Sequence, residues 1–239
     1  MQKLDILAIG VHPDDVELGC SGTLLKHAQL GYSCGILDLT QGELGTRGTA
    51  ETRLQEAKAA AAILGVKVRE NLGFADGFFQ NDKTHQIELI KMIRKYQPDV
   101  VFTNANYDRH PDHGRAAKLT YDAVFLAGLS KIETTLNGEL QKPFRPKVLY
   151  HYIQALEAKP DFAVDISAQM EQKLQSVLAY KTQFFNPDSK EENTFISSPE
   201  FLDFVKARAT HFGVPLGVKF AEGFTVNRTI GVADVMNLF

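Results

Sequence analysis

Two short clusters of histidine and aspartate are the residues of this sequence best suited to metal chemistry. His12-Pro13-Asp14-Asp15 lies near the N-terminus, and His110-Pro111-Asp112-His113 lies near the middle of the chain. Catalytic zinc usually takes three protein ligands and leaves a further position for water. His12, Asp15 and His113 would make such a set. The same two-histidine, one-carboxylate set also suits Fe(II), so the ligand types alone do not decide the metal.

The clusters contain more groups than a metal needs. Asp14 is the natural general base, because a metal lowers the pKa of its water to about 7 and an unligated carboxylate can accept the proton. His110 can stabilise an oxyanion or protonate a leaving amine, and Asp112 can orient the His110 ring. Taken alone, the first cluster also fits a turn with a helix cap, and the second also fits a solvated loop, so this division of roles is an interpretation.

The segment Thr40–Thr49 is a further candidate for substrate binding. It contains three glycines, and Arg47 or Arg53 can hold an anionic group through paired hydrogen bonds. Glu43 is another candidate contact to the substrate. A solvent loop with surface charges is the alternative interpretation. The segment lacks the Walker spacing, and residues 10–22 lack the G-x-G-x-x-G pattern, which argues against phosphate-loop and dinucleotide-binding modules.

Strand-like and helix-like segments alternate along most of the chain, and most of the helical ones end at glycine or before proline. This alternation predicts an α/β fold with a Rossmann-like, mostly parallel sheet and helices on both faces. The expected strands are Leu4–Ile9, Cys34–Leu39, Val66–Leu72, Asp99–Thr103, Lys147–Ile153 and Phe162–Ile166, and the expected helices are Gly22–Leu30, Ala50–Leu64, Ile87–Tyr96, Gly114–Leu126, Met170–Tyr180 and Glu200–Phe212.

Each cluster follows the carboxyl end of an expected strand, where open α/β sheets place their ligand sites. The two clusters can therefore meet in one crevice. We expect a single domain over residues 1–239, with a Rossmann-like core over 1–130 and a C-terminal α/β extension over 131–239. The polar stretch 186–193 is expected to be a loop rather than a linker between domains.

The composition and net charge limit the classes of binding partner that we expect. The formal net charge of -3 gives no electrostatic footprint for nucleic acid or for an anionic membrane. The apolar stretch at the N-terminus is interrupted by Asp5 and is too short for a signal or membrane segment. Two cysteines, Cys20 and Cys34, are too few for a disulfide scaffold. A small-molecule substrate and a cytoplasmic location are expected.

The clusters and their surroundings resemble the LmbE/PIG-L family of zinc-dependent N-acetylglucosamine deacetylases. The resemblance rests on Leu7–Thr23, which contains His-Pro-Asp-Asp-Val-Glu-Leu-Gly-Cys-Ser-Gly-Thr, and on Asp108-Arg-His-Pro-Asp-His-Gly-Arg115. Segments Lys159–Ser167, Ala179–Phe184 and Ala221–Phe224 are similar to the branch that deacetylates a precursor of bacillithiol. Ser21 departs from the glycine found in many members, and this change removes no ligand.

The resemblance implies hydrolysis of the acetamide of an N-acetylglucosamine conjugate, with malate as the aglycone in that branch. Zinc would be held by His12, Asp15 and His113, with Asp14 as the base and His110 facing the oxyanion. Arg53 and Arg109 match basic positions near the substrate pocket. Family members are often trimers or hexamers, so a homo-oligomer is expected.

Three alternatives stay open at this point. Other family branches act on other glucosamine conjugates, including diacetylchitobiose and mycothiol precursors. A metal-dependent phosphoesterase would want further carboxylates for two metals. A non-enzymatic metal-binding or sugar-binding module would have no need of Asp14.

Overall fold

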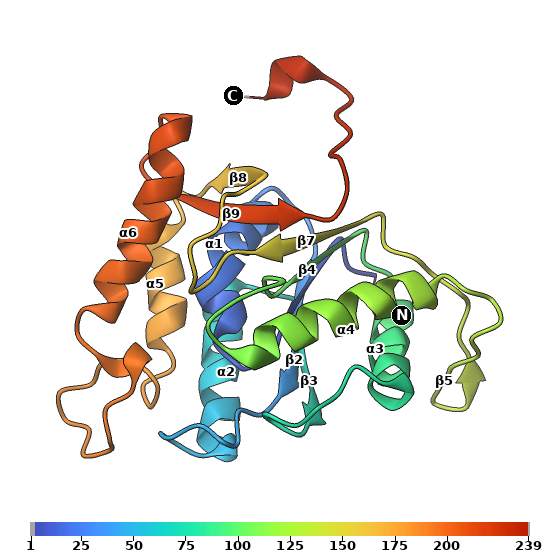
Figure 1. Ribbon diagram of the computed structural model, residues 1–239, viewed down its shortest axis with the longest axis horizontal. Helices are drawn as coiled ribbons and strands as arrows, with labels where there is room; N and C mark the ends of the chain where they lie inside the picture. The colour runs from blue at the N-terminus through green and yellow to red at the C-terminus, as the bar shows by residue number, and fades with distance from the viewer. Residues whose placement is uncertain (1–2, 239) are drawn as a thin grey trace.

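A seven-stranded mixed sheet forms the centre of the molecule, in a computed structural model that describes residues 3–238 (Figure 1). The strand order is β3-β2-β1-β4-β7-β9-β8, and the pairs from β3 through β7 are parallel, whereas β9 is antiparallel to both neighbours. The strands are β1 (Ile6–Gly10), β2 (Cys34–Thr40), β3 (Val68–Phe74), β4 (Val100–Thr103), β7 (Val148–Tyr152), β8 (Phe162–Asp165) and β9 (Ala221–Val226). This sheet confirms the predicted fold class.

Helices cover both faces of the sheet. Along β1, Leu7 and Ile9 pack toward α3 and α4, whereas Ile6 and Ala8 pack toward α1. This alternation is expected of a strand that is buried on both faces. The helices are α1 (Asp15–Gln29), α2 (Ala50–Leu64), α3 (Lys83–Tyr96), α4 (Pro111–Ala127), α5 (Met170–Leu178) and α6 (Phe201–Gly213). No helix within residues 3–238 is long and apolar enough to cross a membrane.

The predicted helix Gly22–Leu30 is only the second half of α1, which begins at Asp15. Cys20 interrupts α1 with φ -147°, and the side chain of Glu222 accepts hydrogen bonds from the backbone N–H groups of Gly22 and Thr23. Glycines lower helix propensity in this segment, and the cap comes from a residue about 200 positions away. A local sequence pattern does not contain that partner.

Other departures from the prediction are smaller. Helix α2 has the predicted bounds, and α3 begins four residues before the predicted start at Ile87. Strand β9 was not predicted, nor was the short hairpin of β5 (Thr135–Leu136) and β6 (Glu139–Leu140). Short 3-10 turns lie at Phe195–Ser197, Val214–Leu216 and Val235–Asn237. Strands β7, β9 and β8 come from the predicted C-terminal extension and continue the same sheet, so the division at residue 130 stays a prediction.

Candidate metal and substrate site

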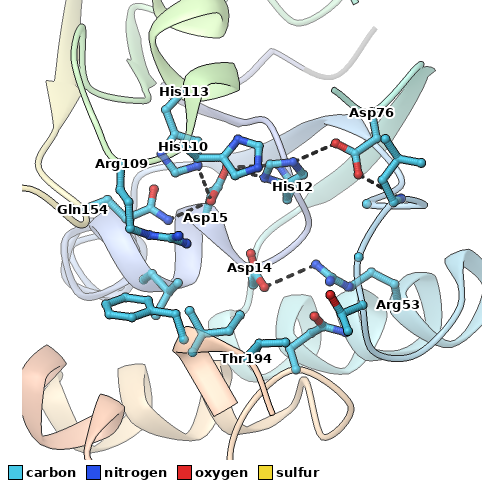
Figure 2. Close-up of a pocket in the computed structure, with 18 of the residues that line it drawn as sticks. His12, Asp14, Asp15, Arg53, Asp76, Arg109, His110, His113, Gln154 and Thr194 are labelled. Atoms are coloured by element: carbon cyan, nitrogen blue, oxygen red, sulfur yellow. Dashed lines mark hydrogen bonds and ion pairs between the residues drawn. The ribbon is translucent and has the colours of Figure 1, made fainter. Parts of the chain in front are cut away.

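A cavity of about 350 Å³ opens at the carboxyl ends of β1 and β4. The strand order reverses between these two strands, because α1 after β1 and α4 after β4 cover opposite faces. This reversal is where open α/β sheets bind ligands. The first cluster follows β1 and the second begins α4. The two clusters therefore meet at this cavity, as predicted (Figure 2).

His12, Asp15 and His113 lie together at the base of this cavity. Nε2 of His113 is 3.2 Å from Oδ1 of Asp15, and Nδ1 of His12 is 3.6 Å from Oδ2 of Asp15. Ligand atoms of a tetrahedral zinc ion lie about 3.3 Å apart, given bonds of about 2.0–2.1 Å. The two distances from Asp15 to the histidine nitrogens are close to this spacing.

The remaining nitrogen of each histidine ring is bound to a carboxylate. Nε2 of His12 lies 2.9 Å from Asp76, and Nδ1 of His113 lies 2.7 Å from Asp108. Carboxylates in this arrangement orient the rings of metal-binding histidines and raise their basicity. Burial alone would lower both pKa values, but Asp15 and Asp76 raise the pKa of His12 to about 10, and Asp15 and Asp108 raise that of His113 to about 9. The carboxylates around His12 and His113 therefore favour positive charge at this part of the cavity.

Asp15 is held by four donors. Its Oδ1 accepts a hydrogen bond from Nε2 of Gln154 at 2.7 Å, and its Oδ2 accepts from Nδ2 of Asn104 at 3.1 Å and from the backbone N–H groups of Val11 and His12. Although burial opposes ionisation, His113 and His12 hold the pKa of Asp15 well below its usual range. Asp15 is thus a fixed carboxylate, which is the form that ligates metals.

Asp14 is buried, and its side chain is not used as a helix cap. It occupies the N-cap position of α1 without a capping hydrogen bond, at φ 132°, a conformation that favours glycine. Its Oδ2 is 3.3 Å from Nη1 of Arg53. Burial raises the pKa of Asp14 to about 7. Strained, buried polar residues of this kind cluster at functional sites, so the helix-cap interpretation of this cluster is wrong for Asp14.

His110 is the N-cap residue of α4, and its Nδ1 accepts a hydrogen bond from the backbone N–H of Asp112 at 3.3 Å. Nε2 of the neutral ring therefore carries the proton. Burial, together with the nearby charges of His12 and His113, lowers the pKa of His110. A neutral imidazole that presents an N–H to the cavity is a suitable donor to a developing oxyanion.

The Asp112 carboxylate was expected to orient the His110 ring, but its contacts lie elsewhere. Its two oxygens accept hydrogen bonds from Gly77 and Arg115, at 2.9 Å and 2.6 Å. Among the described residues, only the backbone of Asp112 is hydrogen-bonded to the ring of His110. The carboxylate instead joins α4 to the loop that follows β3.

Two groups of described residues have ligand atoms that all lie within 4.8 Å of one another: His12, His110 and His113, and His12, Asp76 and Asp112. The set with Asp15 is not one of these two groups. In the second group Asp76 is already bound to Nε2 of His12 at 2.9 Å, so these two residues contact each other directly. In the first, His110 has no carboxylate bound to its ring nitrogens within residues 3–238. In the set with Asp15, each histidine ring is bound to a carboxylate and Asp15 is held by amide donors.

The predicted substrate-binding residues have different surroundings. Arg53 and Arg109 both line the cavity, from opposite sides (Figure 2). Arg53 is bound to Asp14 and to the carbonyl of Pro13, whereas the guanidinium of Arg109 lies over the ring of Phe195 at 4.7 Å. Glu43 is exposed, lies outside the cavity lining and accepts a hydrogen bond from the backbone of Asp76. Arg47 is buried outside the lining and faces Glu191 at 3.6 Å.

Four supporting residues were not predicted. Asp76 follows β3, Asn104 follows β4 and Gln154 follows β7, each within two residues of the strand end. Asp108 lies just before the second cluster. The rule that ligand sites gather at the carboxyl ends of parallel strands would have found the first three, since each is a polar residue at such an end.

The fold and the site together define a class, that of open α/β proteins with a candidate metal centre at the switch point of the sheet. The family model described as PIG-L, GlcNAc-PI de-N-acetylase, matches residues 7–124. A diacetylchitobiose deacetylase of Thermococcus kodakarensis is 33% identical over 232 residues, covering 91% of this chain and 81% of that protein. The chain belongs to the PIG-L/LmbE family of deacetylases.

Solved structures agree with this assignment. The conserved protein TT1542 from Thermus thermophilus is 41% identical, with a TM-score of 0.84 over 96% of this chain and 98% of that one. The N,N'-diacetylchitobiose deacetylase from Pyrococcus horikoshii, complexed with an inhibitor, is 28% identical, with a TM-score of 0.78 over 92% of this chain and 82% of that one. A "Probable N-acetyl-alpha-D-glucosaminyl L-malate deacetylase 2" of Bacillus anthracis is 23% identical, covering 75% of this chain and 81% of that protein. The predicted bacillithiol branch stays a prediction.

Proposed function

We propose that this protein hydrolyses the N-acetyl group of an N-acetylglucosamine conjugate and releases acetate, with N-acetylglucosaminyl-malate of bacillithiol biosynthesis as the substrate. The observation that carries the proposal is the placement of Asp14, a buried carboxylate beside the three candidate ligands that, among the described residues, is bound only to Arg53. Metal storage would have no use for this group. Hydrolysis needs a proton acceptor at this position.

His12, Asp15 and His113 would hold the metal, Zn²⁺ or Fe²⁺. When bound, such a cation supplies Lewis acidity and lowers the pKa of water toward neutrality. The support for a metal lies in the donor set, because both rings have their second nitrogen on a carboxylate and Asp15 is fixed by amide donors.

The protein groups divide the proton and charge transfers of amide hydrolysis. Asp14 accepts a proton from the attacking water, whose oxygen bonds to the acetamide carbon. His110 donates its Nε2–H to the carbonyl oxygen as negative charge develops there. The bond between carbon and nitrogen then breaks, and Asp14 returns the proton to the leaving amine, so that acetate and a free amino sugar are formed. Arg53 holds Asp14 in place.

The competing substrates are other conjugates of the same sugar. The relatives named for diacetylchitobiose make that disaccharide the main alternative. A non-enzymatic metal-binding or sugar-binding module is the alternative from another class. The sequence resemblance also leads us to propose a homo-oligomer, a trimer or hexamer, in the cytoplasm, and the mass in solution tests the oligomer.

Acetate release from a panel of conjugates tests the proposal. The panel holds N-acetylglucosaminyl-malate, N,N'-diacetylchitobiose and a simple methyl N-acetylglucosaminide, each measured with and without a chelator. We expect release from the malate conjugate to be fastest and to stop when the metal is removed. Release only from diacetylchitobiose would overturn the substrate, and no release from any conjugate would overturn the enzyme.

A further inference from the structure

A narrow pocket of about 30 Å³ opens from the side of the main cavity toward α6. The pocket is far smaller than the main cavity of about 350 Å³, so it can take a small polar group rather than a sugar ring. Arg109, His113 and Gln154 line both spaces, and Phe201, Phe204 and Arg208 line the side pocket. A group bound in the pocket would therefore belong to a molecule whose main part lies beside the candidate metal ligands.

Two arginines line this side pocket, and neither forms an ion pair with any residue that the structure describes. Within residues 3–238, the side chain of Arg109 forms neither a hydrogen bond nor an ion pair, and that of Arg208 donates one hydrogen bond, to the carbonyl of Leu18 at 3.0 Å. Arg53 differs, because it is already bound to Asp14. The positive charge at this end of the cavity is thus available to a ligand.

Aromatic rings fix both guanidinium groups. Arg109 lies 4.7 Å from the centre of the Phe195 ring, and Arg208 lies 5.3 Å from the centre of the Phe204 ring. Stacking of this kind leaves the edge of the planar guanidinium free to donate paired hydrogen bonds to a carboxylate. The rings also reduce the freedom that each arginine would lose when a ligand binds.

Nearby carboxylates do not compensate these charges. Asp108 accepts hydrogen bonds from His113 and from two backbone N–H groups, and Glu222 is paired with Lys173 at 2.7 Å. Asp108 and Glu222 therefore act on Arg208 only through longer-range electrostatic attraction. Burial lowers the pKa of Arg208 to about 10, so this arginine is still charged at neutral pH.

We propose that the side pocket between Arg109 and Arg208 binds a carboxylate of the aglycone, so that Arg208 selects conjugates with an acidic aglycone over neutral ones. This inference rests on the proposed function and deepens it, because it assigns the acid-binding role to Arg109 and Arg208 rather than to Arg53. A neutral disaccharide would leave both guanidinium groups without a partner.

The test compares an acidic conjugate, N-acetylglucosaminyl-malate, with the neutral dimethyl ester of its malate. In the wild-type protein we expect kcat/KM for the acid to exceed that for the ester at least tenfold. Arg208→Gln should reduce this ratio about tenfold, mainly through KM for the acid, and Arg208→Lys should reduce it less because the charge is kept. An unchanged ratio in Arg208→Gln would overturn the proposal.

Arg145→Gln is the matched control. Arg145 also stacks on a phenylalanine, Phe125 at 4.4 Å, and donates one hydrogen bond to a backbone carbonyl, but it lies outside both pockets. Its substitution should leave the ratio unchanged. If Arg208→Gln does not fold, the ratio of kcat/KM values in the wild-type protein still tests the proposal. Equal kcat/KM values for the acid and the ester would overturn it. Acetate release from neither conjugate would instead count against the proposed function.

Discussion

Asp76 binds Nε2 of His12 at 2.9 Å and thereby leaves Nδ1 as the ring nitrogen that faces the Asp15 carboxylate. The second oxygen of Asp76 accepts a hydrogen bond from the backbone N–H of Leu44. One carboxylate thus joins the loop after β2, the loop after β3 and the first histidine cluster. The tautomer of His12 that can bind a metal through Nδ1 is set by a residue outside both clusters.

Asp76→Asn should weaken metal binding about 10- to 100-fold, the usual effect of losing such a partner. The amide can no longer act as a charged acceptor for the ring. Competition with a chromophoric chelator measures the dissociation constant. Asp82→Asn is the control, because Asp82 forms a similar pair with His85 at 2.8 Å, exposed on α3, and its substitution should leave the constant unchanged. Equal affinities of Asp76→Asn and the wild type would contradict the role.

The contrast between Asp15 and Asp76 shows what the sequence can and cannot predict. Asp15 was predicted because it lies three residues from His12 and shares the turn set by Pro13. Asp76 is 64 residues from His12, and its contact exists only because β3 and β1 lie in one parallel sheet. The strand expected at Val66–Leu72 ends at Phe74, so the polar residue just beyond that end was not recognised.

Side-chain partners were harder to predict than positions. The spacing of the second cluster places Asp112 near His110, and it is near. Its carboxylate, however, is occupied by Gly77 and Arg115, and Gly77 reaches it only through the tertiary fold. Likewise, Arg208 is an ordinary helical residue in the sequence, and only the packing of α6 beside the cavity brings it to the site.

Asp14→Asn should reduce acetate release about 10²- to 10⁴-fold, since that is the usual contribution of a general base. The amide has nearly the same shape and cannot accept the proton. Metal content, measured by atomic absorption, should stay close to that of the wild type because Asp14 lies outside the proposed ligand set. Native rates in a variant that still holds its metal would mean that another group accepts the proton.

The backbone of Asp14 permits a separate prediction about stability. At φ 132° a side chain is strained, and such residues cost about 1–3 kcal/mol. Asp14→Gly should therefore be about 1 kcal/mol more stable than Asp14→Ala, because both lack the carboxylate and only the glycine relieves the strain. Urea unfolding measures the difference. In the exposed middle of α2, Ala59→Gly should instead destabilise by about 1 kcal/mol, and the same sign at both positions would contradict the argument.

Metal removal should lower the stability of the folded protein. A ligand that binds only the native state stabilises it by about 2.7 kcal/mol at a hundredfold excess over its Kd. Thermal unfolding of chelator-treated protein, with and without added Zn²⁺, should show a large increase in Tm for the wild type. Asp15→Asn should lose most of this increase because it removes the charged ligand. An equal increase in that variant would place the ion elsewhere.

His110→Gln distinguishes the two ligand sets that contain both His12 and His113. If His110 donates to the oxyanion, kcat should fall about 10²- to 10³-fold, the effect of losing one such donor, and the metal dissociation constant should stay within a few-fold. If His110 were a ligand in place of Asp15, the affinity itself would fall together with kcat. The proton on Nε2 favours the first result, because Nδ1 is already an acceptor for the backbone of Asp112. A ring that donates from Nε2 and accepts at Nδ1 has no nitrogen left for a metal.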